Sequence, residues 1–424
     1  MAVKSRLPIF IVGAGVFGAA GALTAIIKHP DSEVVLIDPS HLPHPRSASY
    51  DVSKIIRDDY GQTLHIHMAR SAMNVWLDAD SLYSKFFHRV GMLRCQPDDF
   101  NEKSLAAYKK AGIPTKSRWV DVAEVSPVLA GADFGGMDKV MYNPDYGYVD
   151  AEACLAAVRQ EAVDRGVKLL VGEVTSLTFD DAGDCTGVRL QTEGASQELR
   201  GKVLLCTGAR TAALLRDSAP ERTELHAGNR LKATGAMSFT VRIDGELKER
   251  FDAGPVPVFK NRVEEVMGEL VSYKNGLLKF NRDGCWTLNK DEPWVAPNEP
   301  GLTEWVTDPK AIPDSIKQLA RQTIVGLCGK DLADCEIEEY RFCWDAYTPN
   351  HDFIISKHPH SQNLYVATGG TFHGWKFLPV LGDYIVKMLD NELEPKYRQL
   401  WDWDRVHDED ANTTYPILGA LSEQ

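Results

Sequence analysis

The sequence lacks several features that would assign it to a specialised class of protein. Its eight cysteines are scattered and form no C-x-x-C pair, which excludes zinc-ribbon and thioredoxin-like sites. No apolar run reaches the roughly 18 residues that a membrane-spanning helix needs. No basic segment precedes a short apolar one near the N-terminus, and the final Ser422-Glu423-Gln424 is no peroxisomal signal. We therefore expect a soluble, cytoplasmic protein without a membrane partner.

Positive charge is also scarce. The chain has 60 Asp and Glu against 47 Lys and Arg, and its formal net charge is −13 at pH 7. Without a basic stripe to neutralise phosphates, a nucleic-acid partner is excluded. An anionic substrate is still possible, because a few cations can be focused inside a pocket. The 424 residues include no repeat or flexible linker, and their number predicts two or three interleaved structural units.

The clearest motif stands near the N-terminus. An apolar run over residues 9–12 leads into Gly13, Gly15 and Gly18 in the pattern Gly-x-Gly-x-x-Gly, and a second apolar run ends in Asp38. Gly13 permits a tight turn, Gly15 lets the backbone approach a pyrophosphate, and Gly18 lets the following helix pack close to the sheet. A carboxylate at this distance after the glycines can accept both ribose hydroxyls. The stretch therefore predicts a bound dinucleotide, without choosing between NAD and FAD.

The rest of the chain alternates between two kinds of pattern. Residues 150–165 predict a helix with Asp150 as its N-cap. Residues 232–286 show period-two apolar runs separated by turns, which predict an antiparallel sheet. A strand at residues 363–368, a glycine-rich turn and a helix follow near the C-terminus. We expect a mixed α/β fold with a Rossmann-type dinucleotide domain and a mainly antiparallel β domain that holds the substrate.

Two cations follow the dinucleotide motif. Lys54 and Arg57 stand three residues apart in a mostly polar segment, residues 47–60. On a helix or a short turn this spacing brings both side chains together, where they could approach an anionic ligand. An ordinary solvent-facing segment would show the same pattern, so periodicity alone leaves both interpretations open.

Four stretches spread over nearly the whole chain resemble one family when they are taken together. They are the glycine motif with Asp38; Ser53-Lys54-Ile55-Ile56-Arg57-x-x-Tyr60; Cys343-Trp344 followed by Thr348-Pro349 and Phe353-Ile354-Ile355; and His373-Gly374-Trp375-Lys376-Phe377. In this order and spacing the chain resembles the amine-oxidising flavoproteins of the D-amino-acid-oxidase superfamily. Within that superfamily it is most similar to the monomeric sarcosine oxidase group, with its fungal members that oxidise fructosyl amino acids (amadoriases), saccharopine or pipecolate.

The resemblance implies FAD as the cofactor. It implies an FAD-binding domain built from the discontinuous residues 1–85, 150–225 and 340–424, with residues 86–149 and 226–339 as the substrate domain. It also implies a thioether from Cys343 to the flavin 8α-methyl group, although a lone cysteine is more often an ordinary core residue. The positions that the resemblance assigns to the cofactor are Gly13, Gly15, Val16, Phe17, Gly18, Asp38, Ser53, Lys54, Val174, Cys343, Gly374 and Lys376.

The resemblance also assigns residues to the substrate and to oxygen. Arg57 and Lys376 match residues that bind the substrate carboxylate, and a guanidinium with an ammonium suits that duty. Lys279 matches a lysine near the flavin N5 atom that assists reaction with oxygen, although a surface strand lysine would look the same. The expected protein is a monomer that acts on a small amino-acid-like substrate and oxygen.

Three positions depart from the family pattern. Asp283 stands where sarcosine oxidases carry a histidine, Phe372 where relatives have a small residue, and Arg210 where a tryptophan is common. Asp283 and Phe372 are expected near the substrate, and Phe372 is counted among the residues that bind it. These two changes put sarcosine in doubt as the substrate, and fructosyl amino acids less firmly.

The function that follows is an FAD-dependent oxidase of a secondary amine. A hydride passes from a C–H next to the nitrogen to flavin N5, which gives an imine, and oxygen is reduced to hydrogen peroxide. Three alternatives stay open: a tailoring oxidase of specialised metabolism that captures the imine for cyclisation, a flavin dehydrogenase with another electron acceptor, and a non-catalytic dinucleotide-binding protein. The combination of Cys343, Arg57 and Lys376 argues against the last.

Overall fold

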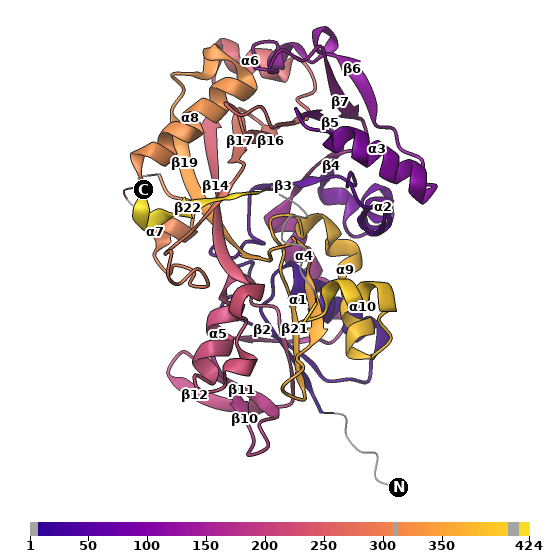
Figure 1. Cartoon of the computed structure of the whole chain (residues 1–424), viewed down its shortest axis with the longest axis vertical. Coiled ribbons are helices and arrows are strands. Elements are labelled where there is room, and N and C mark those ends of the chain that lie inside the picture. Colours follow the sequence, from indigo (N-terminus) through magenta and orange to yellow (C-terminus); the bar gives the residue numbers. More distant parts are fainter. Residues whose placement is uncertain (1–6, 308–309, 311, 406–414) are drawn as a thin grey trace.

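The computed structural model describes residues 7–307, 310, 312–405 and 415–424. Two parts follow one another along its long axis (Figure 1), and each is built on a sheet of its own. The first, called the parallel-sheet part, has six strands in the order β20-β21-β13-β1-β2-β9. Only β20 runs antiparallel to its neighbour. These strands are β1 (Ile9–Val12), β2 (Val34–Asp38), β9 (Lys168–Val171), β13 (Lys202–Leu205), β20 (Ile354–Lys357) and β21 (Leu364–Thr368).

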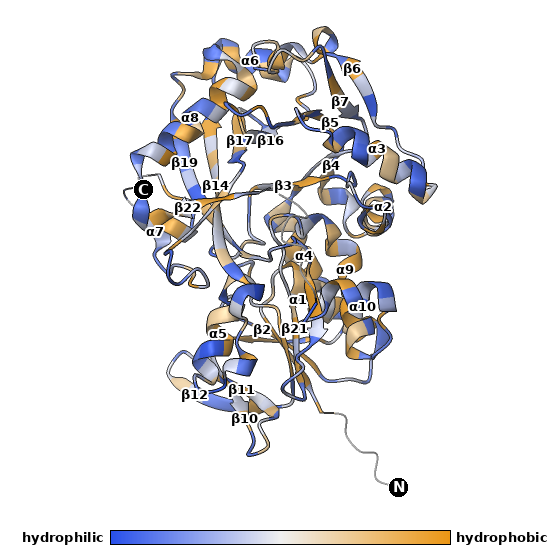
Figure 2. Ribbon diagram, in the orientation of Figure 1, coloured by the Kyte–Doolittle hydropathy of each residue, from blue (hydrophilic) through white to orange (hydrophobic). Residues whose placement is uncertain are grey.

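The N-terminal motif folds as predicted, into β1, helix α1 (Val16–Lys28) and β2. The strands of a parallel sheet are covered on both faces, so their residues form continuous apolar runs rather than alternating ones. Figure 2 shows α1 and the adjoining strands as mostly hydrophobic. Helix α9 (Leu378–Leu389) can pack very close to α1, because a Cβ at Gly382 would lie only 2.2 Å from the carbonyl oxygen of Ala20.

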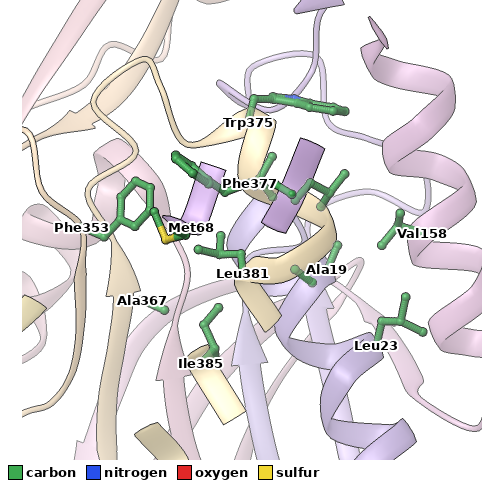
Figure 3. Packing of buried hydrophobic residues seen from close by; sticks show 14 of the residues in the cluster. Ala19, Leu23, Met68, Val158, Phe353, Ala367, Trp375, Phe377, Leu381 and Ile385 are labelled. Atoms are coloured by element: carbon green, nitrogen blue, oxygen red, sulfur yellow. The ribbon is translucent and has the colours of Figure 1, made fainter. Parts of the chain in front are cut away.

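Side chains from three helices fill the core beside the parallel sheet (Figure 3). Ala19 of α1, Leu381 of α9 and Val158 of α4 (Ala151–Asp164) belong to one buried cluster. Helix α4 confirms the helix predicted over residues 150–165, and Asp150 is its N-cap residue. The Asp150 side chain makes no capping hydrogen bond, however, because its carboxylate pairs with His88 and Lys274 instead.

The second part, called the large-sheet part, is built on ten strands. Their order is β22-β18-β14-β17-β16-β15-β5-β7-β6, and β19 also pairs with β14. The antiparallel sheet predicted over residues 232–286 is confirmed by β14 to β17. Helix α8 (Asp314–Cys328), whose polar and apolar residues alternate in Figure 2, packs against β16 and β17. The strands are β5 (Met92–Cys95), β6 (Arg118–Asp121), β7 (Lys139–Asn143), β14 (Lys232–Arg242), β15 (Val258–Asn261), β16 (Gly268–Lys274), β17 (Leu277–Arg282), β18 (Cys285–Thr287), β19 (Ile337–Tyr347) and β22 (Ile417–Ala420).

Residues 47–60 do not form the helix or short turn on which Lys54 and Arg57 were expected to meet. Lys54 lies on strand β3 (Ser53–Ile56), which pairs with β8 (Gly147–Asp150), and β4 (Phe87–His88) completes this small sheet. Backbone pairing with a strand nearly 100 residues away overrides the local pattern. Arg57 lies just after the end of β3. The alternation of side chains along a strand therefore does not place Arg57 on the opposite face from Lys54.

Among the remaining elements, helix α2 (Thr63–Leu77) packs into the core beside the parallel sheet. No helix in the described ranges is long and apolar enough to cross a membrane. The division into two domains at the boundaries given above stays a prediction; β19, which carries Cys343, belongs to the large sheet. These other elements are α2 (Thr63–Leu77), α3 (Phe100–Ala111), α5 (Thr211–Ser218), α6 (Gly245–Asp252), α7 (Pro300–Thr303), α10 (Pro395–Trp401), β10 (Glu173–Phe179), β11 (Cys185–Thr192) and β12 (Ala195–Arg200).

Candidate active site

One cavity of about 980 Å³ is lined by residues of both parts. It brings together most of the residues predicted from the sequence, which come from distant stretches of the chain. Three of them, Gly18, Ser53 and Lys279, do not line it. Those that do are Gly13, Gly15, Val16, Phe17, Asp38, Lys54, Arg57, Val174, Cys343, Phe372, Gly374 and Lys376.

The glycine turn leaves its backbone open to the cavity. Gly13 has φ +95°, and a Cβ there would lie 2.5 Å from the carbonyl oxygen of Cys206. A Cβ at Gly18 would lie 1.8 Å from the carbonyl oxygen of Gly13, so Gly18 serves the packing of the helix, as expected. Helix α1 begins at Val16 with Gly15 as its N-cap residue, and the Val16 N–H donates to Ser49 Oγ at 2.9 Å. The helix N-terminus with its glycine turn faces the cavity, a placement that suits a phosphate group.

Asp38 ends strand β2 at the same turn. Its carboxylate accepts hydrogen bonds from the backbone N–H groups of Ala14, at 2.8 Å, and Ser40, at 3.2 Å. Burial raises the pKa of Asp38, and the two N–H groups and Arg159 oppose that shift. A buried carboxylate fixed beside the glycine turn has the placement that a ribose-binding residue requires. The turn and Asp38 together fit the adenosine diphosphate part of a dinucleotide.

Two of the cysteines line the cavity, and their surroundings differ. Cys343 on β19 has its Sγ atom 3.6 Å from the Nζ atom of Lys54, which is held by Asp51 at 2.8 Å. Burial lowers the pKa of Lys54, but Asp51 and Cys343 together raise it above its usual value, so Lys54 stays a cation. Cys206 has no such partner, and burial raises the pKa of its thiol. Of these two cysteines, Cys343 is therefore the one with a lysine ammonium beside its sulfur atom.

Lys279 is buried against the same carboxylate. Its Nζ atom lies 3.2 Å from Asp51 Oδ2 and 3.2 Å from the carbonyl oxygen of Ser53. Burial lowers the pKa of Lys279, while Asp51 opposes that shift and Lys54 adds to it. Asp51 therefore positions both lysines, a role that the sequence analysis missed. Its only signal was its place just before the Ser53–Tyr60 stretch.

Arg57 and Lys376 both contact Tyr60, Arg57 at the ring and Lys376 at the hydroxyl group. The Arg57 guanidinium lies 5.3 Å from the Tyr60 ring centroid. The Lys376 ammonium donates to the Tyr60 hydroxyl at 3.1 Å and to the carbonyl oxygen of His373 at 2.9 Å. Lys376 pairs with no carboxylate of the described residues. Burial, with Arg57 nearby, holds the pKa of Lys376 well below its usual value.

Arg57 is itself held by an acid that the sequence analysis overlooked. Its Nη1 atom donates to the Asp59 carboxylate at 2.5 Å and to the Asp59 carbonyl oxygen at 2.5 Å. Arg94, on β5, donates from Nε to the other carboxylate oxygen at 3.0 Å. Asp59 thus fixes one edge of the Arg57 guanidinium and shares its negative charge between two arginines.

Phe372 lines the cavity from a strained turn. Thr371 and Phe372 have φ +41° and +59°, and the Phe372 N–H donates to Asp345 Oδ2 at 2.9 Å. The Phe372 ring lies 5.2 Å from that of Tyr415, which also lines the cavity. Asp283, which was expected near the substrate as well, does not line it, because its carboxylate is bound by Lys260 and Arg262 behind the wall.

Comparison with known families agrees with this geometry. The model of the family described as "DAO: FAD dependent oxidoreductase" matches residues 8–388. The chain belongs to this family. The residues that surround the cavity fit FAD, since the glycine turn and Asp38 suit the adenosine diphosphate and the cavity continues past Cys343 to the large sheet.

Individual relatives of this oxidoreductase are distant but match along their whole length. L-saccharopine oxidase of Schizosaccharomyces pombe is 25% identical, over 93% of this chain and 92% of that protein. Monomeric sarcosine oxidase of an Arthrobacter species is 23% identical, over 92% and 93%. A fructosyl peptide oxidase structure superimposes with a TM-score of 0.82 at 19% identity, over 99% of both chains. Amadoriase I of Aspergillus fumigatus gives 0.76 at 22% identity, over 99% and 95%. These structures confirm the expected fold.

Proposed function

We propose that this FAD-dependent oxidoreductase is an oxidase of secondary amines whose substrate is an N-substituted amino acid. The observation that carries the proposal is Lys376, a buried lysine with a depressed pKa that lines the cavity and pairs with no carboxylate of the described residues. A buried cation without a counter-charge is costly, and a substrate carboxylate would supply that charge. Relatives named for saccharopine, sarcosine and N-methyl-L-tryptophan support this substrate class.

Arg57 completes the proposed carboxylate site. Because Asp59 holds its Nη1 atom, the remaining N–H groups are left for a second, bidentate contact. Arg57 and Lys376 both lie against the Tyr60 ring, 5.3 Å and 5.4 Å from its centroid, so one carboxylate could reach both donors. The two cations would hold the amino acid by its carboxylate and so orient the C–H bond beside its nitrogen.

The proposed cofactor residues would hold different parts of FAD. FAD, when bound, takes up the hydride from the carbon beside the amine nitrogen and passes the electrons to oxygen. Gly13, Gly15 and Asp38 would hold its adenosine diphosphate, and Cys343 would hold its ring system through a thioether. Lys279 is proposed as the cation that assists the reaction with oxygen, because a fixed positive charge favours reduction to superoxide. Asp51 keeps that ammonium in place.

An anaerobic flavin-bleaching screen tests the proposed reaction. Purified protein is mixed without oxygen with sarcosine, N-methyl amino acids, fructosyl amino acids, saccharopine and pipecolate, and flavin absorbance is followed. We expect bleaching by at least one of them and hydrogen peroxide once air is admitted. Mass spectrometry of the product separates hydrolysis of the imine from its capture in a ring.

The variant Lys376→Met tests the carboxylate site, with Lys317→Met on the exposed surface of α8 as its matched control. Lys376→Met should raise the substrate KM at least tenfold while FAD content stays at the parent level, because a charge-assisted contact to the carboxylate is lost. An unchanged KM would exclude Lys376 from the site. Absence of bleaching by every amine would contradict the proposed activity itself.

A further inference from the structure

A row of polar side chains crosses the large sheet on the face that lines the cavity. Lys260 on β15 is in register with Glu269 on β16, Glu269 with Asn281 on β17, and Asn281 with Ser238 on β14. Opposite residues of neighbouring strands stand side by side on one face, so these four side chains form a continuous polar row. Glu269, Asn281 and Ser238 line the cavity, and Lys260 does not.

The hydrogen bonds within the polar row converge on Glu269 from both sides. Lys260 Nζ donates to Glu269 Oε1 at 2.5 Å, and Asn281 Nδ2 donates to Oε2 at 2.8 Å. Ser238 donates to the Asn281 side-chain oxygen at 2.8 Å, which fixes the orientation of that amide. The Tyr415 hydroxyl adds a second donor to Oε1, at 3.1 Å. Oε2 therefore receives one donor among the described residues, although a carboxylate oxygen accepts two.

Lys260, which does not line the cavity, helps to keep Glu269 negatively charged. Burial raises its pKa, but Lys260 and the Asn281 amide lower it further, to about 2. Glu269 is therefore ionised and can only accept hydrogen bonds. It is 4% exposed, so a donor that reaches Oε2 from the cavity would be shielded from water. Hydrogen bonds to a charged group in such a place contribute strongly to discrimination.

Aromatic rings bound the space next to Glu269. The Tyr415 ring, whose hydroxyl binds Glu269, lies 5.2 Å from the Phe372 ring. Both residues line the cavity, and Phe372 is held in its left-handed conformation by Asp345. A substrate group bonded to Glu269 would therefore lie beside the Tyr415 ring.

We propose that Glu269 determines substrate specificity by accepting a hydrogen bond from a donor, a hydroxyl or an ammonium, at the end of the substrate's side chain or N-substituent. This inference rests on the proposed oxidation of N-substituted amino acids and adds a second recognition point to the carboxylate site. A substrate without the donor would leave the buried carboxylate oxygen with an unmet acceptor position. Such sites reject analogues that lack the donor more strongly than apolar pockets reject a change of size.

Three probes of similar length isolate this contact. They are Nα-methyl-lysine, which ends in an ammonium, N-methyl-6-hydroxynorleucine, which ends in a hydroxyl, and N-methyl-2-aminoheptanoic acid, which ends in a methyl group. Steady-state rates of hydrogen peroxide formation in air give kcat and KM for each probe with the FAD-loaded protein. We expect one or both donor-bearing probes to exceed the methyl-ended probe in kcat/KM by about tenfold or more. The comparison of the first two identifies which donor Glu269 prefers.

Two variants distinguish recognition of the substrate's hydrogen-bond donor from structural support of the cavity wall. Glu269→Gln should reduce the preference for the donor-bearing probe about tenfold, mainly through KM, with a smaller effect on the methyl-ended probe. Asp283→Asn is the matched control, since Asp283 is also a buried carboxylate on Lys260 but does not line the cavity. It should change the melting temperature and leave the preference intact.

Each result decides between the two roles. Equal kcat/KM of the parent protein for the three probes would overturn the inference, even if neither variant folded, and would leave the proposed activity standing. An equal loss of preference in both variants would also overturn it, since Glu269 would then act only by balancing Lys260. No bleaching with any probe or with any amine of the wider screen would overturn the proposed activity, and this inference with it.

Discussion

The two ends of the cavity are built in opposite ways. The end at the glycine turn presents backbone to the cavity, where Gly13 carries no side chain, and Gly18 lets α1 pack close behind it. The end at the large sheet is made of side chains, such as Arg57, Lys376 and Glu269, that come from separate elements. Backbone can serve any dinucleotide, whereas a set of side chains can be changed one at a time. Cofactor binding therefore rests on a backbone feature that many dinucleotide-binding proteins can share, whereas the choice of substrate rests on side chains particular to this chain.

The largest effect is expected from a side chain added at the glycine turn. Gly18→Val would place Cβ about 1.8 Å from the carbonyl oxygen of Gly13, which forces α1 away from the turn. Overpacking of this kind costs about 3 kcal/mol or more. We expect loss of bound FAD and a lower melting temperature, measured by absorbance at 450 nm and by calorimetry. Normal FAD content would show that the turn tolerates displacement, and would remove the contrast between the two ends.

A complete but more selective effect is expected at Cys343. Cys343→Ser should release all of its flavin into the supernatant after acid precipitation, whereas the parent protein should keep it in the pellet. Cys206→Ser is the control, because its thiol lines the same cavity but has no lysine beside it. Release of flavin from the parent protein would contradict the proposed thioether.

The pH dependence of anion binding sharpens the comparison at the sheet end. The pKa of Lys376 is depressed by burial and by Arg57, so this lysine loses its proton more readily in the free protein. A carboxylate binds the protonated form and raises that pKa, so binding takes up a proton. The Kd of butyrate should therefore rise with pH, by up to about tenfold per unit above the pKa of the free protein. Butyramide, titrated by flavin difference spectra, should show no such slope.

The smallest effect is expected from the residue behind Arg57. Asp59→Asn keeps the shape of the side chain but removes the charge that Arg57 and Arg94 share. We expect a rise of about three- to tenfold in the substrate KM with little change in kcat, because Arg57 loses its orientation but not its charge. Steady-state kinetics measures both constants. A fall in kcat with an unchanged KM would mean that Asp59 affects the chemical step instead.

The candidate site could be predicted from the sequence where the signal was local. Gly13, Gly15 and Asp38 follow from spacing alone, and the resemblance located Lys54, Arg57 and Lys376, all of which line the cavity. The helix or turn expected for residues 47–60 was wrong, because pairing with β8 imposes a strand. The roles assigned to Cys343 and Lys279 stay predictions.

Three cavity residues that the sequence did not reveal, Glu269, Asn281 and Tyr415, depend on strand pairing. Glu269 and Asn281 meet because β16 and β17 are paired in a particular register, with a bulge after Leu270. Tyr415 reaches the cavity because β22, which follows it, pairs with β18. A shift of one residue in a strand would turn these side chains to the other face, and no local pattern records that register.

The sequence by itself determined the dinucleotide turn, the order of helices and strands in the N-terminal unit, and the family. The first two follow from glycine geometry and from apolar periodicity, which act over a few residues, and the family follows from the resemblance of four motifs. Only the tertiary structure decided that Lys376 donates to the Tyr60 hydroxyl and that Glu269 lines the cavity while it binds Lys260. Those contacts join residues far apart in the chain, and long-range strand pairing and burial alone bring them together.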